Sequence, residues 1–201
     1  MIKLTILIPS IPERRGKFTK LRDELINQRS ICNTKHPTLG MIEILYDDSE
    51  SVNNGGISVG AKRDKLMRMA KGDYLCFIDD DETPSPNYVE QLLRMCQMGA
   101  DIITFRSLYK CDTYWGIADM SIHHTTNEQA TPYGSFKRRP FHICPVKLEI
   151  ARSCSFPDIN NGEDWAYMEE VLKHCTTETH TDQILHQYNH SSLTSAVDNI
   201  K

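Results

Sequence analysis

An apolar segment that ends in four consecutive carboxylates constrains this chain more than any other feature. Residues 74–78 read Tyr-Leu-Cys-Phe-Ile, a run of aromatic and branched side chains that predicts a buried β-strand. Asp79, Asp80, Asp81 and Glu82 follow it directly. Two like charges about 4 Å apart repel by roughly 4 kcal/mol at an effective dielectric near 20, so a cation is expected beside them. A divalent ion with oxygen ligands, which can also bind phosphates, is the natural candidate.

Strand and helix patterns alternate through the first half of the chain. The predicted elements, in chain order, are strand 4–8, a helix opened by Pro12, strand 41–46, helix 59–71, strand 74–78, a helix capped by Ser85 and strand 101–105. This alternation is typical of a parallel or mostly parallel sheet covered by helices. The second strand ends in Asp47 and Asp48, which should share an edge with the carboxylates after residue 78. Open α/β sheets bind ligands at that edge.

The second half is less regular. Residues 107–140 are rich in Tyr, His, Thr and Arg and show no clear period. A short strand is expected over residues 141–144 and a helix over 164–174. Residues 181–190 alternate as a strand would, which would place Ile184, His186, Tyr188 and His190 on one face.

Length, charge and cysteine content exclude several classes of protein. A chain of 201 residues corresponds to one domain, and a net charge of −4 with an isoelectric point near 6.1 argues against a general nucleic-acid binder. The apolar start is broken by Pro9 too early for a signal peptide, and no apolar run approaches the roughly 20 residues of a membrane span. Cys76 and Cys96 fall in apolar patterns as reduced core residues, so we expect a cytoplasmic location.

Basic residues accompany the acidic strand ends. Arg14 and Arg15 follow the first strand, and Lys62 and Arg63 precede the third. Carboxylates for a metal and a ribose, with cations for phosphate, are what a nucleoside diphosphate site requires. The sequence has neither a Gly-x-Gly-x-x-Gly after the first strand nor a Gly-Lys-Ser/Thr phosphate loop. The lack of both motifs argues against a dinucleotide dehydrogenase and a P-loop ATPase.

Five stretches in order resemble family 2 glycosyltransferases of the GT-A fold. They are the end of the first strand at Ile8-Pro9-Ser10, the second strand with its final Asp48, residues 60–74, the Asp-x-Asp-like Phe77–Glu82 stretch, and Gly162-Glu163-Asp164-Trp165. The resemblance implies a Rossmann-like α/β fold, a three-layer α/β/α sandwich with a mostly parallel central sheet. It covers nearly the whole chain, so residues 1–201 are expected to form a single domain. Residues 1–106 would be its nucleotide-sugar-binding half and residues 107–201 its acceptor-binding half.

The resemblance also implies a role for particular residues. Asp164 would be the general base, with Glu163 beside it in the catalytic Glu-Asp motif. Asp81 would bind Mn²⁺ or Mg²⁺, and His190 resembles a late histidine that completes the metal or phosphate site. Asp48 would hold the base, and Asp79 and Asp80 would bind the ribose and the diphosphate. The full set of expected nucleotide-sugar-binding residues is Pro9, Ser10, Arg14, Asp48, Lys62, Arg63, Asp79 and Asp80.

The activity implied is transfer of a sugar from a nucleoside diphosphate sugar, expected to be UDP-linked, to a hydroxyl with inversion. The acceptor should lie against residues 107–140, where aromatic side chains could stack on it and Lys137-Arg138-Arg139 could bind an anionic acceptor. A carbohydrate and hydroxymethylated DNA are both open. The chain departs from the family at Ile11-Pro12, where Tyr-Asn is common, and at residues 141–147, which replace a Gly-rich acceptor loop.

Other interpretations stay open at this point. A nucleotidyltransferase can share the sheet and the metal carboxylates, although it often has a Gly-rich loop after the first strand, where this chain has no glycine before Gly16. A non-catalytic nucleotide-sugar-binding module is the third possibility, and the intact Glu163-Asp164 pair argues against it. Asp164 could also serve only to stabilise a helix N-terminus, and His190 could be a structural side chain.

Overall fold

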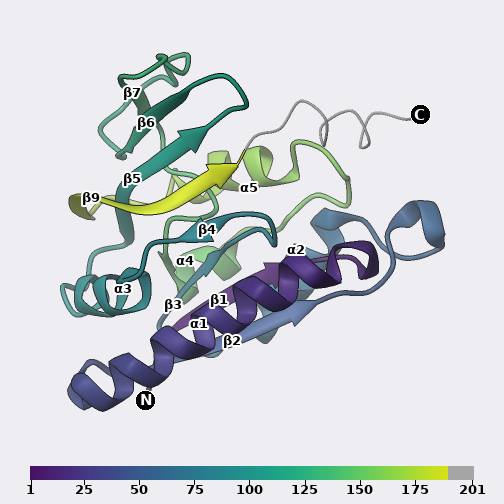
Figure 1. The fold of residues 1–201 in the computed structure, drawn as a ribbon, viewed down its shortest axis with the longest axis horizontal. Helices are drawn as coiled ribbons and strands as arrows, with labels where there is room; N and C mark the ends of the chain where they lie inside the picture. The colour runs from purple at the N-terminus through teal and green to yellow at the C-terminus, as the bar shows by residue number, and fades with distance from the viewer. Residues whose placement is uncertain (190–201) are drawn as a thin grey trace.

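The computed structural model describes residues 1–189 (Figure 1). The strands are β1 (Ile2–Pro9), β2 (Met41–Asp47), β3 (Tyr74–Phe77), β4 (Thr83–Pro84), β5 (Ile102–Lys110), β6 (Trp115–Met120), β7 (Ser135–Arg138), β8 (Val146–Lys147) and β9 (Glu178–Asn189). The helices are α1 (Arg15–Lys35), α2 (Val59–Met69), α3 (Tyr88–Cys96), α4 (Leu148–Ser153) and α5 (Glu163–Val171). The predicted α/β class is confirmed.

The described strands form one mixed sheet in the order β2-β1-β3-β8-β5-β6-β7, with β9 beside β5 and β4 paired to β9. β1 is parallel to both β2 and β3, as the alternating pattern predicts. The short β8 is antiparallel to β3 and to β5, and therefore leaves those two strands parallel to each other. β5 and β6 form an antiparallel pair, so the sheet is mixed rather than purely parallel.

Helices cover the β1–β3 part of the sheet in two groups. α1 packs against α3, and both contact strands of the sheet. α2, α4 and α5 pack against one another and contact β1, β2 and β3. β5, β6, β7 and β9 extend beyond the helices as a curled ribbon (Figure 1). The carboxylates that follow β3 lie beside this ribbon, because Asp79 and Glu82 line one cavity together with side chains of β5, β6, β7 and β9.

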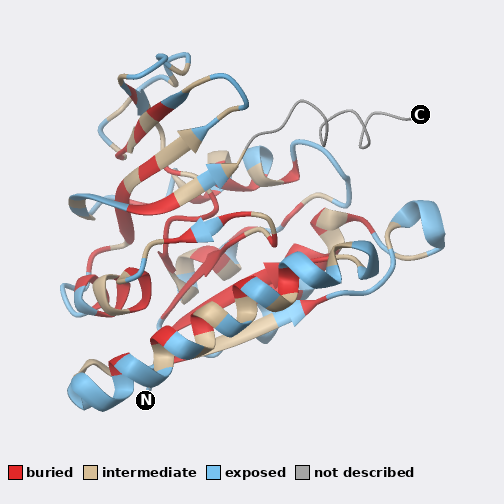
Figure 2. Cartoon of the chain, in the orientation of Figure 1, coloured by how far each residue is buried: buried red, intermediate tan, exposed pale blue. Residues whose placement is uncertain are grey.

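The core lies along β1, β3 and the start of β5 (Figure 2). In β1, Leu4, Ile6, Leu7 and Ile8 are all fully buried, so both faces of this strand are covered. A central parallel strand with helices on each side has no face open to water, which explains why residues 4–8 are apolar apart from Thr5. Burying each such side chain contributes about 1.5–3 kcal/mol.

Helix α1 shows the predicted apolar stripe, with one addition. Phe18, Leu21 and Leu25 are buried as expected. The polar Gln28 is also buried, because its side-chain amide donates to the Ser85 carbonyl oxygen at 2.8 Å and accepts from the Val89 amide at 3.1 Å. This one side chain therefore joins α1 to the beginning of α3.

Two predicted element positions are wrong. The third helix begins at Tyr88, after the predicted start at Ser85, because the Ser85 amide donates to the Leu185 carbonyl oxygen and draws this segment toward β9. Residues 141–144 form a turn, closed by the Cys144 amide on the Phe141 carbonyl oxygen. Pro145 has no N–H, so strand pairing starts only at Val146.

The final strand starts at Glu178 and runs parallel to β5 with two irregularities in register. His186 is buried as its inward position requires, whereas Ile184 and Tyr188 are 41% and 38% exposed. All seven cysteines, including the buried Cys76 and Cys96, are free thiols. No helix within residues 1–189 has the length and apolar character needed to cross a membrane.

Candidate functional site

The acidic ends of β2 and β3 lie at the same edge of the sheet. Pro9 of β1 pairs in register with Asp47 of β2, and the Ile78 amide continues β3 by donating to the Leu7 carbonyl oxygen. Asp47 is buried and forms an ion pair with Lys65 at 2.7 Å. The neighbouring Asp48 is exposed. Asp47 therefore fixes the end of the strand, and Asp48 faces solvent where a ligand can reach it.

Asp80 is held inside this edge. Its carboxylate accepts from Ser10 Oγ at 2.7 Å and from Arg14 Nη1 at 3.1 Å, and the residue is 3% exposed. Burial raises the pKa of Asp80 despite these two donors. The Asp81 carboxylate lies 3.3 Å from Arg14 and 3.6 Å from Lys17, and burial together with the charge of Asp79 raises its pKa as well. The edge thus carries more negative charge than its cations neutralise.

Lys62 joins the loops that follow β1 and β2. Its ammonium donates to the carbonyl oxygens of Ser10, at 2.7 Å, and Ser49. The residue is 1% exposed, and burial lowers the pKa of Lys62. Its position stabilises the two loops that would surround a nucleotide.

Arg63 links the acidic edge to the Glu-Asp motif. Its guanidinium contacts Asp79 Oδ1 at 2.7 Å and Glu163 Oε1 at 3.2 Å, and it lies over the Phe77 ring at 5.2 Å. The side chain is only 3% exposed. Burial raises the pKa of Glu163, whereas the Arg63 charge and His142 outweigh burial and lower the pKa of Asp79. One buried cation therefore holds together two carboxylates from distant parts of the sequence.

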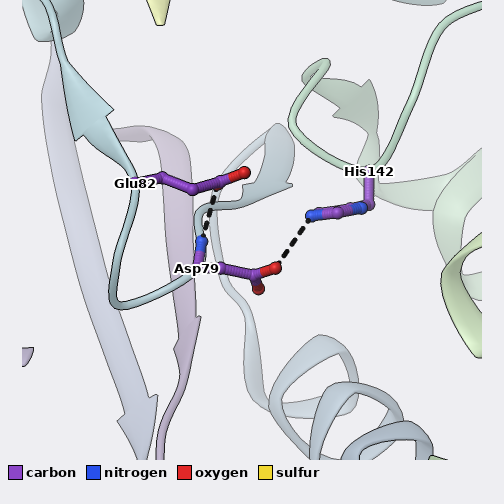
Figure 3. Close-up of side chains that lie close together, drawn as sticks. All are labelled: Asp79, Glu82 and His142. Carbon is purple, nitrogen blue, oxygen red and sulfur yellow. Dashed lines mark hydrogen bonds and ion pairs between the residues drawn. The ribbon is translucent and has the colours of Figure 1, made fainter. Parts of the chain in front are cut away.

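Asp164 and Asp79 lie on opposite sides of one imidazole ring. His142 Nδ1 is 3.2 Å from Asp164 Oδ2, and Nε2 is 3.7 Å from Asp79 Oδ2. Figure 3 shows the ring of His142 pointing at Asp79, whose amide donates to Glu82 at 2.9 Å. Burial alone would raise the pKa of Asp164, but His142 and the charge of Arg63 bring it down to about 2. Asp164 is therefore ionised at neutral pH.

The loop before α5 sets the position of Asp164. Ser58 Oγ donates to Asp158 at 2.5 Å, the Val59 amide donates to Asn160 at 3.1 Å, and the Gly60 amide donates to the Ile159 carbonyl oxygen at 3.1 Å. A Cβ at Gly60 would lie 1.9 Å from a backbone oxygen of this loop, so only glycine permits the contact. The first turn of α2 thereby holds the loop that delivers the Glu-Asp motif to Arg63.

A cavity of about 400 Å³ opens beside these groups. Asp79, Glu82, His142 and Asp164 line one part of it, and side chains of β5, β6, β7 and β9 line the rest. Behind the acidic segment, a hollow of about 850 Å³ is bordered by α1 and by Asp80 and Asp81. A molecule in the first cavity would contact the acidic edge and the Asp164 carboxylate together.

Comparison with known proteins identifies the family. The model of the family described as Glycosyl transferase family 2 matches residues 52–153, about half of the chain. The chain belongs to glycosyltransferase family 2. The matched region contains the acidic segment, Lys62, Arg63 and His142, and ends before the Glu-Asp motif. A comparison with curated proteins found no match.

Solved structures share the fold of this family 2 glycosyltransferase. The crystal structure of S. aureus TarS residues 1–349 superposes with a TM-score of 0.65 at 12% identity, covering 94% of this chain and 60% of that one. Its complex with UDP superposes with a TM-score of 0.63 at 11% identity, covering 94% of this chain and 61% of that one. Its complex with UDP-GlcNAc superposes with a TM-score of 0.61 at 9% identity, covering 94% of this chain and 59% of that one. This chain therefore spans about 60% of the length of that structure, and the likeness confirms the GT-A fold.

The side chains of this family 2 site include ligand atoms that suit a divalent cation. Asp79, Glu82 and His142 each offer a ligand atom within 4.8 Å of the others, and oxygen ligands suit Mn²⁺ and Mg²⁺. Asp81, the predicted ligand, lies on the same segment, and burial, together with the charges of Asp79 and Glu82, raises its pKa. His190 lies outside the described residues; Asn189, just before it in sequence, donates to the Asp81 carbonyl oxygen at 2.7 Å.

Three polar residues of this family 2 site, His142, Glu82 and His186, were given no role in it by the sequence prediction. His142 contacts Asp79 and Asp164, but it lies in residues 141–147, which depart from the family pattern. Glu82 was seen only as part of the acidic run, and it lies 3.0 Å from the buried His186. A histidine placed among carboxylates by a turn leaves no local sequence signal, because the contact depends on how distant segments pack.

Proposed function

We propose that this protein transfers a sugar from a nucleoside diphosphate sugar, UDP-linked, to an acceptor hydroxyl with inversion of the anomeric carbon. The observation that carries the proposal is the position of the ionised Asp164 carboxylate in the same cavity as Asp79 of the acidic edge. Family membership and the fold shared with a protein crystallised with UDP and UDP-GlcNAc support the choice of donor.

The donor would lie along the ends of β1, β2 and β3. The exposed Asp48 is placed to bind the base, and Pro9 and Ser10 form the end of β1 beside it. Asp79 and Asp80 are proposed to serve ribose and diphosphate. Arg14, which already contacts Asp80 and Asp81, would add positive charge near the phosphates.

Asp81, with His190 as a second candidate ligand, is proposed to hold Mn²⁺ or Mg²⁺. When bound, such an ion neutralises charge on the departing diphosphate. Lys62 and Arg63 act differently, because their contacts hold the loops and carboxylates of the site in place.

Asp164 is proposed as the general base, and Glu163 as the residue that fixes it through Arg63. As the acceptor oxygen bonds to the anomeric carbon, the bond from that carbon to the β-phosphate oxygen breaks and the hydroxyl proton passes to Asp164. A carboxylate with a pKa of about 2 can accept this proton because the attacking oxygen becomes strongly acidic as it forms the new bond. The products are the glycosylated acceptor and a nucleoside diphosphate.

The test is an assay of UDP release from a panel of UDP-sugars with Mn²⁺, Mg²⁺ or EDTA. The acceptor panel holds simple saccharides and hydroxymethylated DNA. We expect Asp164→Asn to reduce transfer by about 100-fold or more, the scale of general-base catalysis, with donor binding unchanged. Glu170→Gln, an exposed carboxylate on the same helix that pairs with Lys173, is the matched control and should be neutral. Unchanged transfer by Asp164→Asn would remove it as the base.

Two further readouts sharpen this test. Asp81→Asn should abolish the extra thermal stabilisation that Mn²⁺ gives to the UDP complex. The opposite result is that Glu82→Gln loses the stabilisation by Mn²⁺ while Asp81→Asn keeps it. That result would assign the metal to Asp79, Glu82 and His142 instead of Asp81. Release of pyrophosphate from a nucleoside triphosphate would instead identify a nucleotidyltransferase.

A further inference from the structure

Strand β7 presents an arginine to the cavity that contains Asp164. The strand alternates: Phe136 is buried, Lys137 is exposed and Arg138 is half-buried. Phe136 and Arg138 both line the cavity, and Lys137 points to the opposite face of the strand. β7 is the last strand in the order of the sheet and lies at the edge of the curled ribbon (Figure 1).

The Arg138 guanidinium has no hydrogen-bond or ion-pair partner within residues 1–189. The adjacent Arg139 also lines the cavity, but Glu169 of α5 neutralises it. Arg106, on β5, pairs with Asp119 at 3.1 Å. Partly burying a guanidinium without a partner costs free energy, because its five donors lose water without gaining an acceptor. Arg138 therefore retains its full capacity to bind an anion in the cavity.

Aromatic side chains form the wall between the arginine and the strand β9. Tyr109 of β5 and Tyr188 of β9 stack with their rings 5.3 Å apart and 21° between planes. Phe136 meets Tyr109 edge-to-face at 6.1 Å. All three line the cavity, and Tyr188 is 38% exposed, so the wall reaches solvent. Such a flat apolar surface suits the face of a sugar ring.

Charged side chains of both signs line the cavity. Asp79, Glu82 and Asp164 would repel an anionic group placed beside them. Arg138 comes from a different strand, β7, and no carboxylate within residues 1–189 pairs with it. A ligand that spans the cavity is thus favoured when its neutral hydroxyl meets Asp164 and its anionic group meets Arg138.

We propose that the cavity binds an anionic saccharide acceptor, with its phosphate or carboxylate on Arg138 and its ring against Tyr109 and Tyr188. The inference rests on the proposed function, since it names the acceptor class for the same site. Arg rather than Lys suits this role, because the planar guanidinium can donate two parallel hydrogen bonds to either anion. A volume of about 400 Å³ accommodates a small saccharide.

The experiment measures binding of three probes to the protein saturated with UDP and Mn²⁺, which blocks the donor phosphate site. The probes are glucose, glucose 6-phosphate and glucuronate, and calorimetric titration gives each Kd. We expect both anionic probes to bind at least 10-fold more tightly than glucose, the size of a charge-assisted hydrogen bond. Arg138→Gln should abolish that difference and Arg138→Lys should restore part of it. Lys137→Gln, the neighbour on the outer face, is the matched control and should preserve it.

Two results would overturn the inference. One is equal affinity for glucose and its anionic relatives in the unsubstituted protein. The other is an anionic preference that survives Arg138→Gln, because the anion would then bind elsewhere. Inorganic phosphate at the same concentration tests whether the saccharide ring contributes, and equal binding of phosphate alone would refute the role of the tyrosines. Sugar transfer from UDP-sugars by the unsubstituted protein tests the proposed function separately, because its absence would refute that function whatever the affinity for the anionic probes.

Discussion

Replacing Arg63 by methionine should test whether buried charge compensation holds the two halves of the site together. The guanidinium is 3% exposed and contacts Asp79 at 2.7 Å and Glu163 at 3.2 Å. Methionine preserves most of the volume and can still pack on Phe77, over which the guanidinium lies at 5.2 Å. The substitution therefore removes charge and donors while leaving little cavity.

The expected cost is large because two carboxylates lose their shared cation. Removing one partner of a buried ion pair costs about 3–5 kcal/mol. A typical domain has a free energy of unfolding of only about 5–15 kcal/mol, so Arg63→Met should lose a substantial part of it. Arg94→Met is the matched control, because Arg94 pairs with Glu90 on the surface of α3 and is 45% exposed. Such exposed pairs contribute about 0.3–0.5 kcal/mol.

Urea denaturation at pH 7.5 and 25 °C, followed by circular dichroism, gives the free energies of unfolding. Glu163→Gln and the double variant complete a double-mutant cycle. Because Glu163 is left buried and unpaired in Arg63→Met, adding Glu163→Gln should recover about 1 kcal/mol or more of the loss. A cost for Arg63→Met as small as that of Arg94→Met, or strict additivity in the cycle, would refute the reasoning.

Two further predictions concern groups whose pKa values the structure shifts. Burial would raise the pKa of Asp101, but hydrogen bonds from Thr176 and an ion pair with Lys147 outweigh it and hold the pKa well below its usual range. That stability is present above the ordinary carboxyl pKa and is lost as pH falls, so the roughly 1–3 kcal/mol cost of Asp101→Asn at pH 7 should shrink below about pH 4 in urea denaturation. His142→Gln should let the pKa of Asp164 rise from about 2 toward 3.8, so the ratio of variant to unsubstituted transfer rates should fall between pH 6 and pH 4. A ratio that does not change with pH would contradict this role of His142.

The acidic edge could be predicted because strand direction alone determines it. Once residues 4–8, 41–46 and 74–78 are recognised as parallel strands, their carboxyl ends must meet, and the register of Pro9 with Asp47 confirms this. Which carboxylate faces solvent could not be predicted, because it depends on side-chain partners. Lys65 holds Asp47 inward, so Asp48 is the exposed member of the pair.

The curled ribbon escaped prediction for a different reason. In β6 the buried positions are Gly116, Ala118 and Met120, so small side chains occupy two of the three inward sites. Every second residue of β6 is buried, as in an ordinary half-buried strand. The sequence does not show this, because large apolar residues do not alternate with polar ones along it. Gly116 is required there, because a Cβ would lie 2.8 Å from the Thr131 carbonyl oxygen.

The charges around Arg63 explain why this site should depend on what it binds. Asp79, Glu163 and Asp164 bring three negative charges to the cluster, and Arg63 brings one positive charge, with His142 as the remaining group that can carry another. The cluster is therefore negative whether or not the imidazole is protonated. Substrate binding removes water from this net negative charge. That step is favourable only if the ligand supplies hydrogen-bond donors or a cation. A hydroxyl directed at Asp164 and a metal-bound diphosphate at the adjacent edge provide both, which is why donor and acceptor should each bind more tightly when the other is present.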